Sequence, residues 1–239
     1  MSLITKVYRK ILSISHLDSI FGELGTHRTI SFGYGHLRSG LLRRPVANKG
    51  RLIPWYSYSA IDYLNSIDTS SFRVLEYGGG NSSFWWADRC KHLTTIESEK
   101  EWFQVLLGLG KNHSNLEFQH YSEREMYTGA INSIAPNVVI IDGLYRSDCA
   151  TKVLELGLGQ LQQLQIVIFD NSNWFPAAIK RLTDGLHDFQ RVDFSSLGPI
   201  VAFPTTTSLF LRTTNTKIVL KDEQINPTAA LPFTHPEDY

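Results

Sequence analysis

Five short apolar runs recur along the middle of this chain at the spacing of a strand and helix repeat. They lie at residues 72–77, 93–96, 116–120, 138–142 and 166–170. Helix-like stretches separate or follow them, at 82–90, at 99–109, from Ser122, at 148–159 and from Pro176. Ser122 and Glu125 form a predicted capping box, and Pro176 suits the first turn of a helix. This alternation predicts a parallel sheet that helices cover on both faces.

The alternation ends near the C-terminus. Segments 191–194 and 208–212 are strand-like, and no helical stretch separates them. They predict an antiparallel strand pair that closes the sheet. The expected fold class is therefore α/β, with a doubly wound, mostly parallel sheet and an antiparallel strand pair at its C-terminal end.

The sequence divides into three parts around this core. Residues 1–54 are expected to form an N-terminal basic segment, helical at 6–20 and irregular at 25–54, that covers the pocket of the main domain. Residues 55–214 are expected to form that main domain, which would carry the catalytic site. Residues 215–239 are rich in proline and polar residues and are expected to form an extended C-terminal tail.

Charge is distributed unevenly, although the net charge is zero. Residues 1–51 hold nine lysines and arginines against two acidic residues. This basic arm is either a solvated surface on an acidic body or a region that attracts an anionic small-molecule acceptor. Its basic residues are not interleaved with stacking aromatics in a repeating way, so we expect no nucleic-acid partner.

The chain carries no signal for a membrane or for secretion. No apolar run approaches the ~20 residues that a membrane helix requires, and the first residues lack the pattern of a secretory signal. The two cysteines, Cys90 and Cys149, do not make a disulfide scaffold and favour a reducing compartment. We therefore expect a cytoplasmic protein without a membrane partner, whose oligomeric state the sequence does not indicate.

A run of three glycines, Gly78–Gly80, follows the first core strand and precedes a helix. Glycines there let the backbone turn sharply and approach a ligand, and ligands in such sheets bind at the carboxyl ends of the strands. The fingerprint Gly-x-Gly-x-x-Gly for dinucleotides fails because Ser83 occupies its third position, and the lysine of a phosphate-binding loop is absent. Glu76, two residues before the glycines, would repel a pyrophosphate and suits a ligand with a cationic amino-acid moiety.

Glu76-Tyr77-Gly78-Gly79-Gly80 resembles the first motif of class I S-adenosylmethionine-dependent methyltransferases, and Thr95-Ile96-Glu97 resembles the second. The resemblance covers residues 55–212 and implies S-adenosylmethionine as cofactor. In that family the acid at the position of Glu97 holds the ribose hydroxyls, and a carboxylate can accept both hydroxyl protons. The residues expected to bind the cofactor are Glu76, Tyr77, Gly78, Gly79, Gly80, Asn81, Ser82, Glu97, Ser98 and Asp142.

Two later strands end on acids, Asp142 and Asp170, and Asn171 follows the second. The carboxyl ends of these strands should lie beside the glycine loop, and two carboxylates with an amide oxygen suit Mg²⁺. The set resembles the metal triad of magnesium-dependent, catechol-type O-methyltransferases and is similar to that of antibiotic-sugar O-methyltransferases. It implies Mg²⁺ on Asp142, Asp170 and Asn171 and a hydroxyl of a sugar or polyol as methyl acceptor. The other interpretation is an Asx turn at Asp170-Asn171 and a loop cap at Asp142.

The proton acceptor is open. The catechol-type enzymes carry a lysine three residues after the first acid, where this chain has Tyr145, followed by Arg146. The expected catalytic residues are Asp142, Tyr145, Arg146 and His120, which ends the third strand. With Mg²⁺, the metal would lower the pKa of the acceptor hydroxyl. Without it, His120 or His36 would serve as general base.

Two other functions compete with methyl transfer. An aminopropyltransferase would use a similar glycine loop, although residues 142–145 do not match its usual acidic loop. A binding protein on a degenerate methyltransferase fold would bind the cofactor or an acceptor without turnover. Titration with S-adenosylmethionine and an assay of its consumption separate the three.

Overall fold

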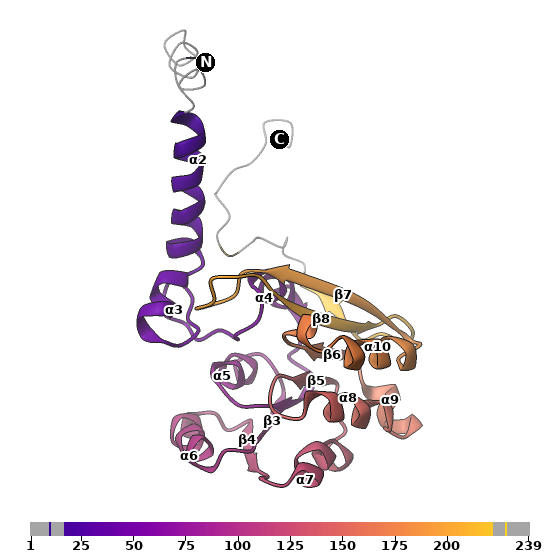
Figure 1. Cartoon of the computed structure of the whole chain (residues 1–239). Helices are drawn as coiled ribbons and strands as arrows, with labels where there is room; N and C mark the ends of the chain where they lie inside the picture. The colour runs from indigo at the N-terminus through magenta and orange to yellow at the C-terminus, as the bar shows by residue number, and fades with distance from the viewer. Residues whose placement is uncertain (1–9, 11–16, 222–227, 229–239) are drawn as a thin grey trace.

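A seven-stranded sheet forms the centre of the computed structural model, which describes residues 10, 17–221 and 228. The strand order is β4-β3-β2-β5-β6-β8-β7 (Figure 1). These strands are β2 (Arg73–Tyr77), β3 (His92–Glu97), β4 (Leu116–His120), β5 (Val138–Ile141), β6 (Ile166–Phe169), β7 (Phe189–Ser196) and β8 (Thr205–Arg212). Neighbours from β4 to β6 are parallel, whereas β8 pairs antiparallel with both β6 and β7. The predicted fold class is confirmed.

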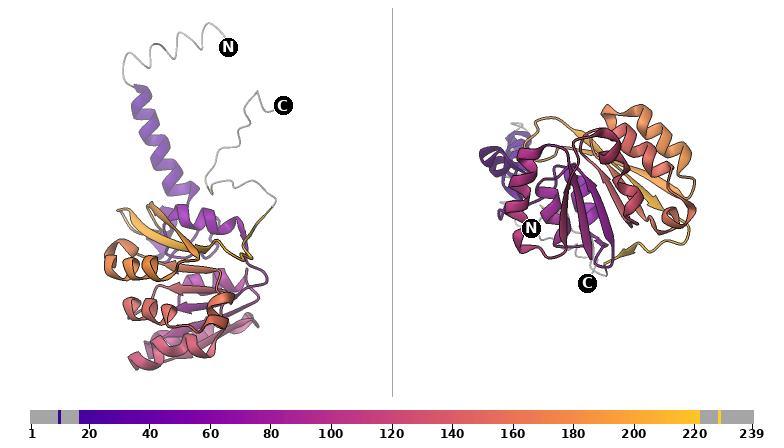
Figure 2. Two further views of the ribbon diagram at one scale, coloured as in Figure 1. Left: turned by 90° about the vertical axis from the view of Figure 1, so that its right-hand side faces the viewer. Right: turned by 90° about the horizontal axis from the view of Figure 1, so that it is seen from below.

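Helices cover both faces of the sheet (Figure 2). They are α4 (Tyr58–Asn65), α5 (Asn81–Ala87), α6 (Lys100–Leu109), α7 (Arg124–Gly129), α8 (Arg146–Leu154), α9 (Leu158–Gln163) and α10 (Pro176–Gly185), with the short turns η2 (Gly110–Asn112), η3 (Ala130–Ser133) and η4 (Ser172–Trp174). Because strand side chains alternate between faces, Val138 and Ile140 of β5 pack with α4 and α5, and Val139 and Ile141 pack with α7, α8 and α10. Both faces are therefore apolar and buried, as the apolar runs of the sequence predict.

Two local predictions differ from the structure, and a third is confirmed. Helix α7 begins at Arg124 with Glu123 before it and no side-chain cap, so the predicted capping box of Ser122 and Glu125 is wrong. The predicted helix at 148–159 is two helices, α8 and α9, because Glu155 ends the first and Gly157 precedes the second in an extended conformation. Pro176 does begin α10.

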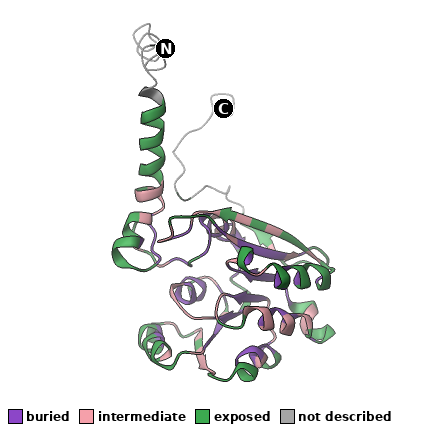
Figure 3. Ribbon diagram, in the orientation of Figure 1, coloured by how far each residue is buried: buried purple, intermediate pink, exposed green. Residues whose placement is uncertain are grey.

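The N-terminal segment is more helical than predicted. Helix α2 (Leu17–Arg28) continues into the π-turn η1 (Thr29–Gly33), and α3 (His36–Leu42) follows. Most of the predicted helix at 6–20 lies outside the described residues. Helix α2 projects from the body and is exposed from Ser19 to Arg28 (Figures 1 and 3).

The start of the C-terminal segment is held against the body. Strand β9 (Val219–Leu220) pairs antiparallel with β1 (Ile67–Asp68), and the backbone N–H of Thr228 donates to Asp62 at 3.1 Å. The rest of the tail, 222–227 and 229–239, lies outside the described residues. Within the described part of the chain, no helix is long and apolar enough to cross a membrane.

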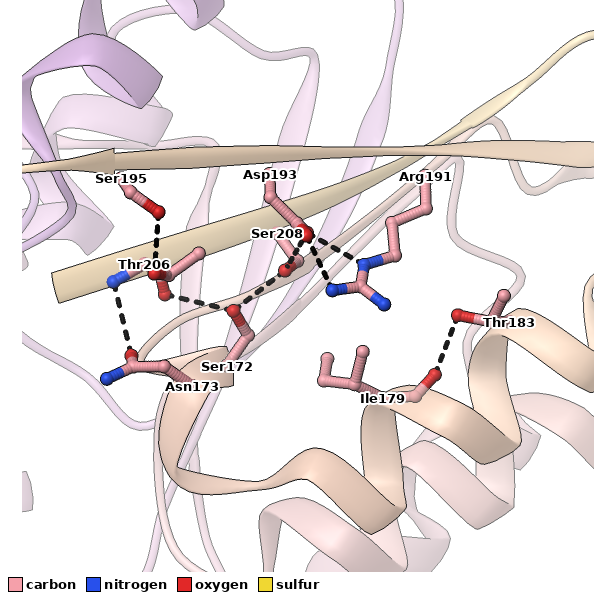
Figure 4. A network of polar contacts seen from close by, with 9 residues as sticks. All are labelled: Ser172, Asn173, Ile179, Thr183, Arg191, Asp193, Ser195, Thr206 and Ser208. Atoms are coloured by element: carbon pink, nitrogen blue, oxygen red, sulfur yellow. Dashed lines mark hydrogen bonds and ion pairs between the residues drawn. The ribbon is translucent and has the colours of Figure 1, made fainter.

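Polar contacts join the antiparallel strands to the loop that follows β6 (Figure 4). The buried Ser208 hydroxyl of β8 donates to the Asp193 carboxylate of β7 at 2.6 Å and lies 2.7 Å from the Ser172 hydroxyl of η4. The backbone N–H of Thr206 donates to Asn173 at 3.2 Å. These contacts fix the backbone directly after Asp170 and Asn171, which lie at the candidate site.

We expect Ser208→Ala to lower the free energy of unfolding by about 1–2 kcal/mol, because it removes the buried hydroxyl that joins Asp193 to Ser172. Urea unfolding at pH 7 measures the change. The matched control is Ser195→Ala on β7, whose hydroxyl contacts Thr206 at 2.8 Å at an exposed position of the same strand pair. The control should change stability by less than about 0.5 kcal/mol. Equal effects of the two variants would contradict the role given to Ser208.

Candidate active site

Two glycine-containing loops touch at the carboxyl edge of the sheet. Gly78 follows β2 and has a φ of +90°, and an added Cβ there would lie 2.5 Å from the Cα of Gly143, which follows β5. An added Cβ on Gly143 would in turn lie 2.1 Å from the Tyr127 hydroxyl. Both positions require glycine, because β2 and β5 are adjacent parallel strands whose loops leave the sheet side by side.

A cavity of about 680 Å³ opens above this contact. Most of the predicted site residues line it: Gly78, Gly79, Gly80, Asn81, Ser82, Glu97, Ser98, Asp142, Arg146, Asp170 and Asn171. It lies where the strands β2, β3, β5 and β6 end, the edge at which sheets of this type bind ligands. These predicted residues therefore lie together at one cavity, which makes it the candidate site. Four predicted residues, Glu76, Tyr77, Tyr145 and His120, are not part of its lining.

Glu97 ties the ends of two strands to this cavity. Its side chain is 8% exposed, and Oε2 accepts the backbone N–H of Gly79 at 3.1 Å. Oε1 accepts the backbone N–H groups of Ser98 at 2.7 Å and of Glu99 at 2.9 Å. Oε1 therefore has both of its lone pairs occupied, whereas Oε2 keeps one, so Glu97 can still accept a hydroxyl hydrogen from a ligand.

Glu76 lies beneath the glycine loop and does not reach the cavity. It is fully buried, and Oε2 accepts the Ser83 hydroxyl at 2.5 Å and the Thr95 hydroxyl at 2.8 Å. The Ser83 oxygen in turn accepts the backbone N–H of Gly80 at 3.1 Å. Oε1 is buried and has no hydrogen-bond partner among the described residues. Burial raises the pKa of Glu76 from 4.5 to about 7. Glu76 was expected to contact a cationic ligand directly, but it instead supports the glycine loop from below.

Tyr77 also points away from the cavity. Its ring is fully buried against Tyr127, and its hydroxyl donates to the carbonyl of Thr128 at 2.8 Å. Tyr77, expected among the cofactor-binding residues, therefore does not present its side chain to the cavity. Because side chains of a strand alternate between faces, Tyr77 packs under the helices that follow β4 and β5.

Arg146 gathers the polar groups of two loops. Its guanidinium lies 3.0 Å from Oδ1 of Asp142 and donates to Oδ1 of Asn171 at 3.1 Å. It also donates to the carbonyl oxygens of Asp142 at 2.8 Å, Gly143 at 3.0 Å and Asp170 at 2.6 Å. The side chain is 15% exposed, so the planar guanidinium acts as a fixed cation between the loops after β5 and β6.

The predicted Mg²⁺ triad does not fit this arrangement. Arg146 occupies Oδ1 of Asp142 and Oδ1 of Asn171, and Asp170 accepts the Thr207 hydroxyl at 2.6 Å. Within the described part of the chain, no group of three or more His, Cys, Asp or Glu side chains could hold a metal ion. The positive charge expected between Asp142 and Asn171 is therefore that of the Arg146 guanidinium. We assign no step to Mg²⁺.

The carboxyl groups of Asp142 and Asp170 are protonated more readily than that of free aspartate. Burial raises the pKa of Asp142 to about 6, even though Arg146 opposes the shift. Burial and the charge of Asp142 raise the pKa of Asp170 well above its usual range. Asp142 is the more accessible, because its side chain is 18% exposed whereas Asp170 is 2% exposed. A carboxylate with a pKa near 6 is suited to accept a proton near neutral pH.

Three candidate bases lie away from the cavity. Tyr145 has a φ of +50° and packs its ring edge against Tyr127 on the outer side. His120 lies 3.2 Å from the carbonyl of Ser98 and packs on Phe103. His36 contacts the Tyr58 hydroxyl at 3.3 Å. None of the three lines the cavity, so the structure does not favour the predicted catalytic roles of Tyr145 and His120 or a histidine base.

The rest of the cavity wall comes from residues that the motifs did not single out. These are Arg43, Arg44, Pro45, Trp55, Trp102, Tyr127, Gly143, Leu144, Trp174, Val201 and Thr205. Trp102 donates its indole N–H to the carbonyl of Gly79 at 2.8 Å, and Asn81 donates to the carbonyl of Pro45 at 2.7 Å. Part of the basic N-terminal segment thus lies at the cavity. In the sequence, only the excess of arginine in this segment indicated that it would lie near a ligand site.

Comparison with known proteins identifies the fold. No protein-family profile matches the chain, and no curated protein sequence matches it. Among solved structures, the precorrin-6y C5,15-methyltransferase of Geobacter metallireducens is similar, with 11% identity over 65% of this chain and 87% of that chain and a TM-score of 0.50. An rRNA methylase from Streptococcus thermophilus has 15% identity over 63% and 92% of the two chains and a TM-score of 0.46. The N-methyltransferase NodS from Bradyrhizobium japonicum has 15% identity over 63% and 90% and a TM-score of 0.43. The chain has the Rossmann-like fold of class I S-adenosylmethionine-dependent methyltransferases.

One expectation about partners is corrected by these structures. The sequence predicted that the chain has no nucleic-acid partner. Proteins of this fold include a 23S rRNA methyltransferase, an rRNA methylase and a pre-rRNA processing protein. The exclusion of nucleic acid was therefore wrong, because the absence of an aromatic and basic repeat does not distinguish nucleic-acid enzymes within this fold.

We expect Glu76→Gln to change how stability depends on pH. Because the pKa of folded Glu76 is raised from 4.5 to about 7, its contribution to stability is fully present below pH 4.5 and is lost as pH rises through about 7. Glutamine cannot ionise, so the variant should gain on the order of 2–3 kcal/mol relative to wild type between pH 5 and pH 8. Urea unfolding at both pH values measures this gain, with the exposed Glu101→Gln as control. Parallel pH dependence of wild type and Glu76→Gln would disprove it.

Proposed function

We propose that this chain is a methyltransferase that binds S-adenosylmethionine in the 680 Å³ cavity at the carboxyl edge of the sheet. The observation that carries the proposal is the meeting of Gly79 and Glu97, whose backbone N–H and carboxylate are joined at 3.1 Å in the cavity wall. A close-approach glycine loop and an acid at the end of the next strand are the two elements that this cofactor requires. The fold and the position of the cavity support the same assignment.

The chain's own groups divide the binding of the cofactor between them. Backbone groups of Gly78–Ser82 lie at the start of α5, where the amino-acid part of the cofactor would approach the chain. Glu97 would accept a ribose hydroxyl hydrogen with the free lone pair of Oε2, and Ser98 continues the wall beyond it. Glu76 keeps the loop in shape from below, through the hydroxyl groups of Ser83 and Thr95. The cofactor, when bound, supplies the electrophilic methyl group.

We propose a hydroxyl of a small molecule, of the sugar or polyol type, as the methyl acceptor. Asp142 and Asp170 place two carboxyls in the cavity, and carboxylates bind hydroxyl groups by accepting their hydrogens. Trp55 and Trp174 line the same cavity and are about half exposed, so their ring faces are free to pack against the apolar face of a sugar ring.

Asp142 is the proposed proton acceptor. It is the more exposed of the two carboxyls and its pKa is about 6, so it is ionised at neutral pH and can still take a proton from the acceptor hydroxyl. Arg146 acts as a positioning residue, because its guanidinium fixes Asp142 and Asn171 relative to each other. Transfer then requires a direct approach of the acceptor oxygen to the methyl carbon, which is a problem of positioning.

A screen for methyl transfer tests the acceptor class. Labelled S-adenosylmethionine is incubated with the full chain and sugars, polyols, catechols, amines, proteins or RNA. The proposal predicts label on hydroxyl compounds and loss of the label when the hydroxyl is blocked. Label only on amines, on proteins or on bases of RNA would contradict the hydroxyl assignment, and transfer of an aminopropyl group from the decarboxylated cofactor would identify the alternative enzyme.

With an acceptor in hand, Asp142→Asn tests the base. We expect kcat to fall at least about 100-fold, because the amide cannot accept the proton, whereas the wild-type rate should fall as pH is lowered through about 6. The matched control is Asp148→Asn on α8, whose carboxylate pairs with Arg124 at the surface at 2.6 Å. Retention of the wild-type rate and pH profile by Asp142→Asn would exclude Asp142 as the base.

A further inference from the structure

A second cavity of about 620 Å³ lies next to the candidate active site. Its wall is built from the N-terminal segment, α4 and α5, and Arg44 and Asn81 line both cavities. The two hollows therefore share a boundary, and a ligand that fills the second can extend a group past Arg44 into the first. The proposed function uses only the first cavity.

The second cavity gathers positive charge that is not neutralised. Arg44, Arg51, Arg89 and Lys221 line it, against one acid, Asp88. Within the described part of the chain, none of these four basic side chains forms an ion pair. Asp88 instead lies 3.3 Å from His113. The field in the hollow is therefore positive and attracts an anion.

Arg89 is held in place although it has no anionic partner. Its guanidinium lies over the Trp85 ring at 4.0 Å and donates to the Trp85 carbonyl at 2.8 Å. Burial lowers the pKa of Arg89 most, the charge of Asp88 partly offsets this, and the nearby charge of Arg51 lowers the pKa further. An anion bound beside Arg89 and Arg51 would relieve both of the effects that lower the pKa.

The remaining wall fits the carbon part of an organic ligand. Ile53, Ile61, Phe84 and Tyr58 line the cavity beneath the basic groups. A guanidinium presents paired N–H donors that match the oxygens of a phosphate, and arginine is the preferred residue for that group. A cluster of three arginines above apolar side chains thus suits a phosphate ester more closely than a lone carboxylate.

We propose that the second cavity binds a phosphate group of the methyl acceptor. The rest of the acceptor then extends past Arg44 toward Asp142 in the first cavity. The identification of the ligand as the methyl acceptor rests on the proposed function, whereas the binding of phosphate in this cavity does not. The phosphate can belong to a phosphorylated sugar or polyol or to the backbone of an RNA, since both present the same oxygens.

Calorimetry of the full chain with pyrophosphate at low salt tests the site. We expect saturable binding that Arg51→Gln weakens at least fivefold. The matched control is Lys49→Gln, which makes the same change of charge two residues away on an exposed side chain that lines neither cavity. It should weaken binding less than twofold. Arg44→Gln is a second variant, and thermal unfolding verifies that each variant is folded.

Three results would overturn the proposal. They are the absence of saturable pyrophosphate binding, equal effects of Arg51→Gln and Lys49→Gln, and binding of citrate as tight as that of pyrophosphate. Titration of the same samples with S-adenosylmethionine separates this proposal from the function: loss of cofactor binding with intact pyrophosphate binding would defeat only the function. Competition of pyrophosphate by a phosphorylated sugar or by a short single-stranded RNA identifies the source of the phosphate, and failure of both to compete counts against the site.

Discussion

The contact between Gly78 and Gly143 determines the shape of the candidate site. The two loops leave adjacent parallel strands, and a Cβ on either glycine would lie less than 3 Å from the other loop. This close packing keeps the loops low at the edge of the sheet, so that the space above them stays open. Glu97, from the next strand on one side, and Asp170, from the next strand on the other, then face the same cavity. The parallel order of the strands thus brings together residues that are far apart in the sequence.

Charge in the cavity is balanced by a protein side chain. Arg146 contacts the side chains of Asp142 and Asn171 and three backbone carbonyls, so the loops after β5 and β6 form one unit. The unit includes a carboxyl whose pKa of about 6 is set by burial against the opposing charge of Arg146. Removal of the arginine would leave a buried carboxylate without its partner, which favours its neutral form. The arrangement is how the proposed base, Asp142, would be positioned by a protein side chain.

Much of the fold was predictable from the sequence, because buried parallel strands are apolar along their whole length. The five runs ending at Tyr77, Ile96, His120, Asp142 and Asp170 match β2 to β6 with shifts of no more than one residue. The glycine loop and the strand-end acids line one cavity because parallel strands end at one edge of the sheet. The predictions failed where a residue's direction mattered. Glu76 and Tyr77 point into the packed interior, and Tyr145 and His120 point to the outside, which strand position alone does not reveal.

Two further features depended on contacts that span long distances in the chain. Arg146 was considered as a catalytic residue, but its bonds to the loop after β6 depend on residues 24 and 25 positions away. The cavity wall from Arg43 to Pro45 reaches the glycine loop through Asn81, 36 positions away. The basic composition of the N-terminal segment indicated an anionic ligand, and no local pattern could show which side chains line a hollow.

The central claim is that Glu97 and the glycine loop hold S-adenosylmethionine in this cavity, and calorimetric titration of the cofactor tests it most directly. The wild-type chain should bind, and Glu97→Gln should weaken binding at least tenfold, about 1.4 kcal/mol, because the amide has one acceptor oxygen and cannot accept both the backbone N–H groups and a ribose hydroxyl. Glu99→Gln, two residues away and outside the cavity wall, should bind within twofold of wild type. No binding by the wild-type chain, or equal affinity of Glu97→Gln and wild type, would contradict the account.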